Sequence, residues 1–164
     1  MRPAWINQLP LKEIDEISEQ MKLPKNLLAA IIQQESRGNP NAVRYEPYWQ
    51  WFYEIKASAR RLGSSDDTER ALQACSWGLC QVMGSVCREA GFQNWLSELT
   101  DIKLNLKYGA RHLKRFLAQY PAGINDAISA YNQGSAKKDD NGRYKNQAYV
   151  DAVLANKAQL DKPE

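Results

Sequence analysis

The feature that most constrains the fold is a short helical segment that is bounded at both ends and carries one carboxylate. Four apolar residues recur at a spacing that places them on one broad face of a helix: Leu27, Leu28, Ile31 and Ile32. Pro24 precedes them where a helix can begin, and Gly38 follows them where a helix commonly ends. Glu35 lies one turn beyond Ile31 on the same face. A charged group on an apolar face is costly unless it has a partner or a function, so we expect the rest of the chain to surround Glu35.

The length and composition indicate one ordinary globular domain. The chain has 164 residues, of which 43% are hydrophobic and 25% charged, and we take 1–164 as a single domain with one core. No apolar run approaches the roughly 20 residues that cross a bilayer, so we expect no transmembrane segment. The net charge of +3 is compatible with an acidic polymer as partner. It is too mild to indicate nucleic acid, which usually requires a denser basic patch.

Three cysteines and one histidine leave little scope for a metal site. The cysteines are Cys75, Cys80 and Cys87, and an odd number cannot close into a complete set of disulfides. Their spacings match no zinc signature, and His112 is the only histidine. We therefore expect three small buried thiols in a reducing compartment, and neither a metal nor another cofactor.

The first 22 residues do not have the pattern of a secretory leader. Five charged residues fall where a leader would be apolar: Lys12, Glu13, Asp15, Glu16 and Glu19. We therefore expect no signal peptide in this chain.

Helical spacing recurs along most of the chain, and no segment shows a convincing strand alternation. Proline, glycine and asparagine residues separate the expected helices, which cover 10–23, 24–37, 47–62, 66–75, 81–90, 94–99, 101–119, 124–132 and 147–160. Asp66 with Glu69 three residues on resembles a capping box. The sequence thus predicts an all-α domain without internal repeats.

Three short motifs follow one another along the chain, each beside a helix end or a glycine bend. They are Glu35-Ser36-Arg37-Gly38-Asn39-Pro40, Ser76-Trp77-Gly78-Leu79-Cys80-Gln81-Val82-Met83 and Ala130-Tyr131-Asn132-Gln133-Gly134. In this order they resemble the soluble-type lytic transglycosylases and, more distantly, the goose-type lysozymes. The segment Arg44-Tyr45-Glu46-Pro47 resembles the variant found among bacteriophage cell-wall enzymes. The resemblance covers roughly 23–155 and implies a lysozyme-like, all-α domain with a substrate groove between helices.

The resemblance also implies roles for individual residues of the first two motifs. Glu35 matches the catalytic acid/base of the family, and Gln81 matches a glutamine that contacts the glycan. Gly78 would let the backbone pass close to the sugar, as glycine does where a side chain would obstruct. Met83 occupies the position of a family residue packed at the floor of the cleft.

The third motif and the last helix supply the remaining groove residues. Tyr131 and Asn132 match an Ala-Tyr-Asn motif in which the tyrosine hydroxyl sits near the catalytic carboxyl and the asparagine braces the cleft. Tyr149 resembles a C-terminal tyrosine that also lines the groove. We therefore predict a groove that these three side chains line together with Glu35 and Gln81.

The chain departs from the family pattern at several positions. Cys80 stands where the family commonly has methionine or another large residue. Arg44 falls where some members have a serine close to the catalytic glutamate, and Lys145 falls where some have a second glutamate. An insert over 45–75 separates the first two motifs more widely than in the bacterial members. These changes leave Glu35 untouched and bear on the finer substrate contacts.

The chemistry expected of Glu35 follows from its neighbours. To protonate the oxygen of a glycosidic leaving group at neutral pH, a carboxyl needs a raised pKa. Apolar neighbours such as Ile31 and Ile32 would raise the pKa of Glu35 by disfavouring its charged form. The resemblance implies that this one acid serves both steps of a transglycosylation at the MurNAc–GlcNAc β-1,4 bond of peptidoglycan, which leaves a 1,6-anhydromuramyl end.

Two other functions remain open at this stage. Most glycosidases use a second carboxylate, and five acidic residues of the insert are candidates for one in a hydrolytic muramidase: Glu46, Glu54, Asp66, Asp67 and Glu69. Among them, Glu46 belongs to the Tyr-Glu-Pro signature, and it is as well suited to bracing the cleft as to taking part in the reaction. The other function, a non-catalytic glycan-binding or structural domain, would keep the groove without the reaction.

Several prominent residues have simpler interpretations. The aromatic residues of 48–53 are expected in the core and the cleft wall, where Trp49 or Trp51 can stack on a sugar ring. His112 lies mid-helix among basic residues, so we expect it at the surface. The charged run 137–140 is expected in a solvated loop.

The expected substrate lies outside the cytoplasm, whereas we expect no leader. A bacteriophage enzyme made in the host cytoplasm resolves this conflict if a holin releases it as an endolysin or if the virion carries it. A bacterial enzyme whose leader was trimmed is the alternative, against which Met1 argues. We expect a monomer that acts on peptidoglycan strands, with chito-oligosaccharides as weak analogues.

Overall fold

The structure is a computed structural model that describes residues 3–163, so Met1, Arg2 and Glu164 of the expected domain lie outside the described residues. The described chain is mostly helical, which confirms the predicted all-α class. Its helices are α1 (Leu11–Met21), α2 (Leu27–Ser36), α3 (Ile55–Leu62), α4 (Asp66–Gln73), α5 (Gly84–Glu89), α6 (Ile102–Gln119), α7 (Ile124–Gln133) and α8 (Gln147–Leu160), with short 3-10 helices at Ala4–Gln8 and Leu96–Thr100. None of the helices within 3–163 is long and apolar enough to cross a membrane.

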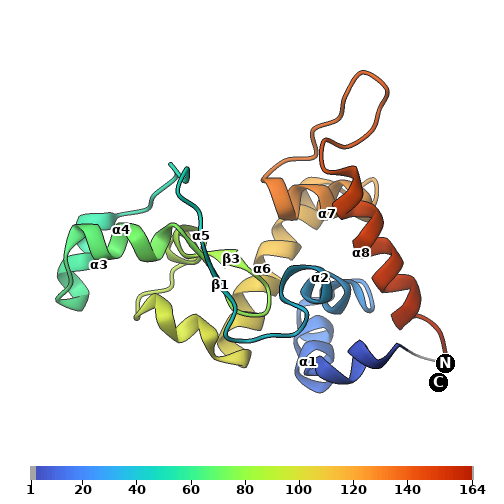
Figure 1. Ribbon diagram of the computed structural model, residues 1–164, viewed down its shortest axis with the longest axis horizontal. Coiled ribbons are helices and arrows are strands. Elements are labelled where there is room, and N and C mark those ends of the chain that lie inside the picture. Colours follow the sequence, from blue (N-terminus) through green and yellow to red (C-terminus); the bar gives the residue numbers. More distant parts are fainter. Residues whose placement is uncertain (1–2, 164) are drawn as a thin grey trace.

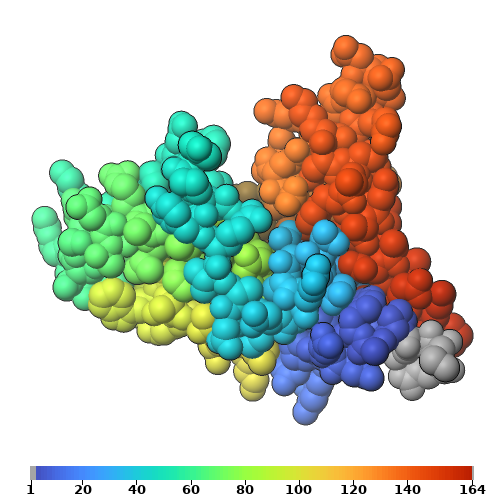
Figure 2. Space-filling view, in the orientation of Figure 1, coloured from blue at the N-terminus to red at the C-terminus, as the bar shows by residue number. Residues whose placement is uncertain are grey.

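The helices form two groups with α6 between them (Figure 1). On one side, α2 packs on α8 and α1, and α7 packs on α6 and α8. On the other side, α3 packs on α4, which in turn contacts α5. Figure 2 shows a hollow between the two groups, bordered by the teal segment around residue 50 and by the orange surface of α7 and the loop after it.

Helix α2 is buried more completely than one apolar face predicts. Six consecutive residues, 27–32, are at most 1% exposed, because α2 lies against α1, α6 and α8. The helix begins at Leu27 rather than three residues earlier, since Asn26 takes a left-handed conformation with φ 62°. At the other end Arg37 is also left-handed, with φ 54°. Glu35 therefore lies in the last turn of a helix whose body is core.

A small antiparallel sheet is the main departure from the predicted fold. It joins β1 (Val43–Tyr45), β2 (Cys75–Trp77) and β3 (Val82–Met83) in that order. Strands of two or three residues are too short to show the alternation by which a strand is recognised in a sequence. The small sheet therefore adds to the predicted all-α class without any strand alternation in the sequence that would indicate it. Besides that of α2, two further predicted helix starts are wrong, because α3 begins at residue 55 instead of 47 and α5 at residue 84 instead of 81.

The bend between β2 and β3 is held on α6 by one buried amide. The Asn105 side chain donates to the carbonyl oxygens of Trp77 and Leu99, both at 2.8 Å, and accepts from the Cys80 N–H at 2.8 Å. Gly78 is left-handed with φ 64°, and a Cβ atom there would stand 2.4 Å from the Asn105 amide nitrogen. The bend thus requires glycine both for its backbone conformation and for the close approach of α6.

Helices α4 and α5 are joined by a buried ion pair. Glu69 is fully buried and accepts hydrogen bonds from Arg88 at 2.8 and 3.1 Å and from Gln73 at 2.9 Å. The predicted capping box is wrong, because Ser65 caps α4 by accepting from the Thr68 N–H at 3.1 Å. Glu69 instead compensates the Arg88 guanidinium, which would be costly to bury alone.

Replacing Arg88 with alanine is expected to lower the free energy of unfolding by about 3–5 kcal/mol, because it leaves the Glu69 carboxylate buried and unpaired. Arg115→Ala is the control. Its pair with Glu89 spans 3.9 Å and both side chains are more than half exposed, so its loss should cost at most about 1 kcal/mol. Urea denaturation followed by circular dichroism measures both changes. Equal small effects would contradict a stabilising role for the buried pair.

Candidate active site

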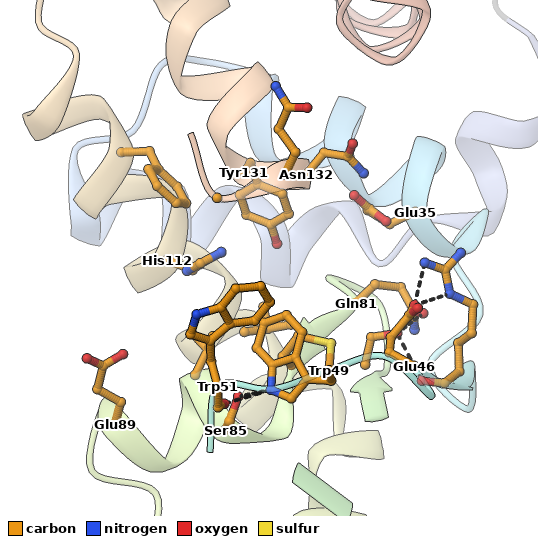
Figure 3. Close-up of a pocket in the computed structure, with 18 of the residues that line it drawn as sticks. Glu35, Glu46, Trp49, Trp51, Gln81, Ser85, Glu89, His112, Tyr131 and Asn132 are labelled. Carbon is orange, nitrogen blue, oxygen red and sulfur yellow. Dashed lines mark hydrogen bonds and ion pairs between the residues drawn. The ribbon is translucent and has the colours of Figure 1, made fainter. Parts of the chain in front are cut away.

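A cleft of about 870 Å³ opens between the two helix groups, within the size range of ligand sites in proteins. Its walls come from the end of α2, the segment 44–53, the β2–β3 region with α5, one face of α6, and 131–135 at the end of α7. Figure 3 shows a close-up of these walls. The lining residues that bear on function are Glu35, Arg44, Glu46, Trp49, Trp51, Gln81, Met83, Glu89, His112, Arg115, Tyr131 and Asn132.

Glu35 reaches the cleft from the last turn of α2 and is held by a hydrogen bond. The Tyr149 hydroxyl on α8 donates to its Oε1 at 2.5 Å. Burial raises the pKa of the Glu35 carboxyl, while the Tyr149 hydrogen bond and the positive charge of Arg44 oppose this shift to a smaller extent. Glu35 therefore keeps its proton to a higher pH than an exposed glutamate does, which is what a general acid requires.

The two tyrosines of the predicted groove have different partners. The Tyr131 hydroxyl donates to the carbonyl oxygen of Cys80 at 2.8 Å, and its buried ring lines the cleft. Burial, and to a smaller extent the nearby Cys80 and Glu35, raises the pKa of the Tyr131 phenol. Tyr149 is outside the described cleft wall, yet its hydroxyl is the one bonded to Glu35. The resemblance places the Tyr131 hydroxyl near the Glu35 carboxyl. The hydroxyl that bonds to this carboxyl is instead that of Tyr149 on α8.

Gln81 lines the cleft but its amide is already engaged within the protein. Its Oε1 accepts from the Ser76 hydroxyl at 2.8 Å, and its Nε2 donates to the carbonyl oxygens of Gly78 at 2.8 Å and Ala42 at 3.0 Å. These bonds tie β2 and the bend to Ala42, the residue before β1. Gly78 itself is absent from the described cleft wall, and the group that closely approaches it is the Asn105 amide rather than anything in the cleft.

Asn132 and Met83 lie on different walls of the cleft. Asn132 is exposed at the end of α7, and its Oδ1 accepts from the Asn146 amide at 3.0 Å. Asn146 also bonds to Ser129, so it ties the start of α8 to α7. Met83 is partly buried and is the last residue of β3. Asn132 is therefore oriented by Asn146, at the start of α8. Its amide NH₂ donates none of the described hydrogen bonds.

Among the described residues, three carboxylates line the cleft: Glu35, Glu46 and Glu89. Glu46 is paired with Arg44, whose Nε donates to its Oε1 at 2.6 Å, as the dashed lines of Figure 3 show. The other candidates for a second carboxylate, Glu54, Asp66, Asp67 and Glu69, do not belong to the described cleft wall. Glu89, which the sequence analysis did not single out, ends α5 with no motif around it that would mark it.

The segment 46–54 runs along the cleft in an irregular conformation instead of forming the start of a helix. Trp49 is anchored because its indole N–H donates to the Ser85 hydroxyl at 3.0 Å and to the Trp51 carbonyl oxygen at 2.7 Å. The two tryptophan rings meet edge to face at 5.1 Å, and Trp51 is 70% exposed. Together they form a wall opposite Tyr131 (Figure 3), with ring surface suited to stacking on a sugar.

His112 is not the surface residue that the sequence predicts. It lines the cleft, with its ring edge to face against Phe116 at 4.9 Å and Tyr131 at 5.0 Å. Burial, helped by the charge of Arg115, lowers the pKa of the imidazole to about 4. Its Nδ1 is buried and has no hydrogen-bond partner among the described residues. The ring is therefore neutral over the physiological range and widens the aromatic surface of the cleft.

The three cysteines are free, as a chain with an odd count allows. Cys80 and Cys87 are buried, whereas Cys75 is partly exposed, so the expectation of three buried thiols holds for two. Burial raises the pKa of Cys87 to about 12, which keeps it as an unreactive thiol. Within 3–163 no three His, Cys, Asp or Glu side chains are grouped in a way that could hold a metal ion.

Comparison with family models places the chain in a known family. The model described as Transglycosylase SLT domain matches residues 12–152, which is most of the chain, so the protein belongs to this family. The match confirms the resemblance to the soluble-type transglycosylases and the lysozyme-like fold, and it begins at α1, earlier than the predicted core at 23. Comparisons with curated proteins and with solved structures give no match. Membership indicates a peptidoglycan-degrading protein of the lytic transglycosylase type.

Tyr149→Phe is expected to raise the pKa of Glu35, because the lost hydroxyl stabilises the charged form of the carboxyl. The pKa can be read from the carboxyl ¹³C resonance during a pH titration. Tyr144→Phe is a matched control, since that hydroxyl bonds to Asp126 instead. A pKa of Glu35 that falls or stays constant in Tyr149→Phe would show that the hydrogen bond does not stabilise the carboxylate.

Arg44→Gln is expected to raise the pKa of Glu35 as well, since it removes a positive charge that favours the carboxylate. Unlike the effect of Tyr149, this difference should shrink at high ionic strength, because salt screens charges across a solvent-filled cleft. The same NMR titration at low and high salt measures it. Arg143→Gln removes an equal charge from the exposed loop after α7 and should leave Glu35 unchanged.

Proposed function

We propose that the protein is a lytic transglycosylase that cleaves the MurNAc–GlcNAc β-1,4 bond of peptidoglycan and leaves a 1,6-anhydromuramyl end, with Glu35 as its only acid and base. The observation that carries the proposal is a carboxyl with a raised pKa, fixed by Tyr149 at the wall of a cleft. Membership of the transglycosylase family supports the same class of reaction.

In the first step, the protonated Glu35 carboxyl donates its proton to the glycosidic oxygen as the bond from that oxygen to C1 of the muramyl residue breaks. The leaving strand departs with a free 4-hydroxyl. The N-acetyl group of the substrate stabilises the positive charge that develops at C1. Glu35 is now a carboxylate, and the hydrogen bond from Tyr149 stabilises this charge.

In the second step, the Glu35 carboxylate takes the proton of the muramyl 6-hydroxyl while that oxygen bonds to C1. The proton balance closes on Glu35, which ends protonated, and no water is consumed. Two features favour this route over hydrolysis. The attacking oxygen belongs to the bound sugar, and a strand bound between the aromatic walls, such as Trp51 and Tyr131, displaces water from the cleft.

A hydrolytic muramidase is the second candidate, and Glu46 is the observation that favours it. Its carboxylate lines the same cleft as Glu35 and could serve as the second carboxylate of a glycosidase. Against this, the Glu46 carboxylate is already bound by the Arg44 guanidinium, so its Oε1 atom is engaged within the protein and is not free to bind an attacking water.

We infer a bacteriophage origin from the segment 44–47, which resembles phage cell-wall enzymes. On this proposal the protein acts on the host peptidoglycan as a monomer, after holin-dependent release or as part of the virion.

Glu35→Gln should lower the rate of strand cleavage by at least about a hundredfold, because the amide cannot deliver a proton. The assay is mass spectrometry of the muropeptides released from purified peptidoglycan. The wild-type products should carry 1,6-anhydromuramyl ends, which are lighter than hydrolysed ends by one water. The matched control Glu46→Gln should still form anhydro ends.

The contrary outcomes separate the alternatives. Hydrolysed ends that disappear in Glu46→Gln would identify a muramidase with a second carboxylate. Wall clearing that is undiminished in Glu35→Gln would rule out Glu35 as the acid, and no cleavage by the wild-type protein would leave a glycan-binding domain.

A further inference from the structure

The aromatic wall of the cleft is carried by a segment that has little regular structure of its own. Within 46–54 the chain forms neither helix nor strand. Its side chains that line the cleft include Tyr48, Trp51 and Tyr53, which are 88%, 70% and 39% exposed. A segment of this kind does not hold its side chains in place by its own backbone bonds, so contacts with neighbouring elements must set its position.

The contact that fixes the segment just before α3 is the side-chain amide of Gln73 on α4. Its Oε1 accepts from the Tyr53 N–H at 2.8 Å, and its Nε2 donates to the Tyr53 carbonyl oxygen at 2.7 Å. The amide therefore pairs with the backbone of one residue in both directions, as a neighbouring strand does. Gln73 is fully buried, whereas Tyr53 is partly exposed, so this pair joins the core to the wall of the cleft.

A buried carboxylate sets the orientation of the Gln73 amide. The Nε2 atom also donates to Glu69 at 2.9 Å, and Glu69 is held in turn by Arg88, whose Nη1 donates to two backbone carbonyl oxygens. If the amide were flipped, its oxygen would face the Glu69 carboxylate and its NH₂ would face the Tyr53 N–H, and all three bonds would be lost. The buried cluster therefore presents the amide to Tyr53 in one orientation.

We propose that Gln73 is a positioning residue of the site, which holds the segment 46–54 so that Trp49 and Trp51 meet the glycan strand in a fixed place. Gln73 does not belong to the described cleft wall, so it acts through Tyr53. The inference rests on the proposed function and names a residue that sets the affinity for the strand. Because Glu35 and Tyr149 lie on α2 and α8, loss of the Gln73 bonds should leave proton transfer intact.

The test replaces Gln73 with methionine, which has a similar volume but cannot bond to Tyr53. Binding of soluble, uncross-linked glycan strands is measured by calorimetry in a Glu35→Gln background, and cleavage by the rate of release of anhydro ends. We expect Kd and KM to rise by about tenfold, the scale of one aromatic contact, while kcat changes by less than about twofold. The control Ile14→Val trims a core residue of α1 outside the described cleft wall and should leave these constants unchanged.

A double-mutant cycle asks whether Gln73 acts through the aromatic wall. Trp51→Ala, which removes an exposed side chain, should weaken binding by about tenfold. If Gln73 positions this wall, Gln73→Met should add at most about twofold in the Trp51→Ala background. Exchange of the Tyr53 amide hydrogen, followed by NMR, should become faster in Gln73→Met because its acceptor is lost.

A second variant, Gln73→Asn, keeps a buried amide that is one methylene too short to bridge Tyr53 and Glu69. It should have the same effects, and it replaces the methionine variant if that protein folds poorly.

Four results would overturn the inference. They are an unchanged Kd in a folded Gln73 variant, a fall in kcat as large as the rise in KM, losses that multiply to about a hundredfold in the double variant, and a failure of both Gln73 variants to fold, which would make the residue purely structural. A loss of equal size in Ile14→Val would assign the effect to stability and would overturn it as well. A wild-type protein that releases no anhydro ends contradicts the proposed function alone, because the binding cycle is measured without cleavage.

Discussion

The arrangement of the site depends on the burial of α2. The six residues 27–32 are almost entirely inaccessible, and each large apolar side chain of this kind stabilises a fold by roughly 1.5–3 kcal/mol. This is enough to offset the cost of a carboxyl partly withdrawn from water at the end of the helix. Because α8 packs along α2, the same contact that forms the core brings Tyr149 to Glu35. The packing of α8 on α2 therefore both forms the core and sets the geometry of the site.

The cleft contains a carboxyl whose pKa is raised, that of Glu35, and a charged pair beside it, Arg44 with Glu46. Burial raises the pKa of Glu35, and Tyr149 and Arg44 limit the rise. Arg44 is itself engaged by Glu46. Burial thus favours the neutral form of the Glu35 carboxyl, whereas the Tyr149 hydrogen bond and the Arg44 charge favour its charged form. The proposed mechanism uses both forms in turn, and these opposing influences are the physical basis for proposing that one residue supplies them.

Two residues of the second motif serve the fold more visibly than the ligand. Gly78 lets the β2–β3 bend approach Asn105 on α6, and the Gln81 amide holds Ala42, just before β1, against that bend. A motif that suggests substrate contacts can thus be required because it shapes the wall of the cleft. His112 shows the opposite case. No motif surrounds it in the sequence, yet it lies in the cleft wall between Phe116 and Tyr131.

The sequence by itself determined the helical class, the family and the position of Glu35 at the end of an apolar helix, because apolar periodicity, helix ends and short motifs are local properties of the chain. Most helices were predicted within a few residues. The short strands, the irregular segment 46–54 and the buried Glu69–Arg88 pair were not, since each depends on residues distant in sequence. Only the tertiary structure decided that Tyr149 rather than Tyr131 bonds to Glu35, and that the Gln73 amide bonds to the backbone of Tyr53. Which side chains meet across a cleft is settled by the packing of whole helices against one another, and this packing is not encoded in the spacing of any one segment.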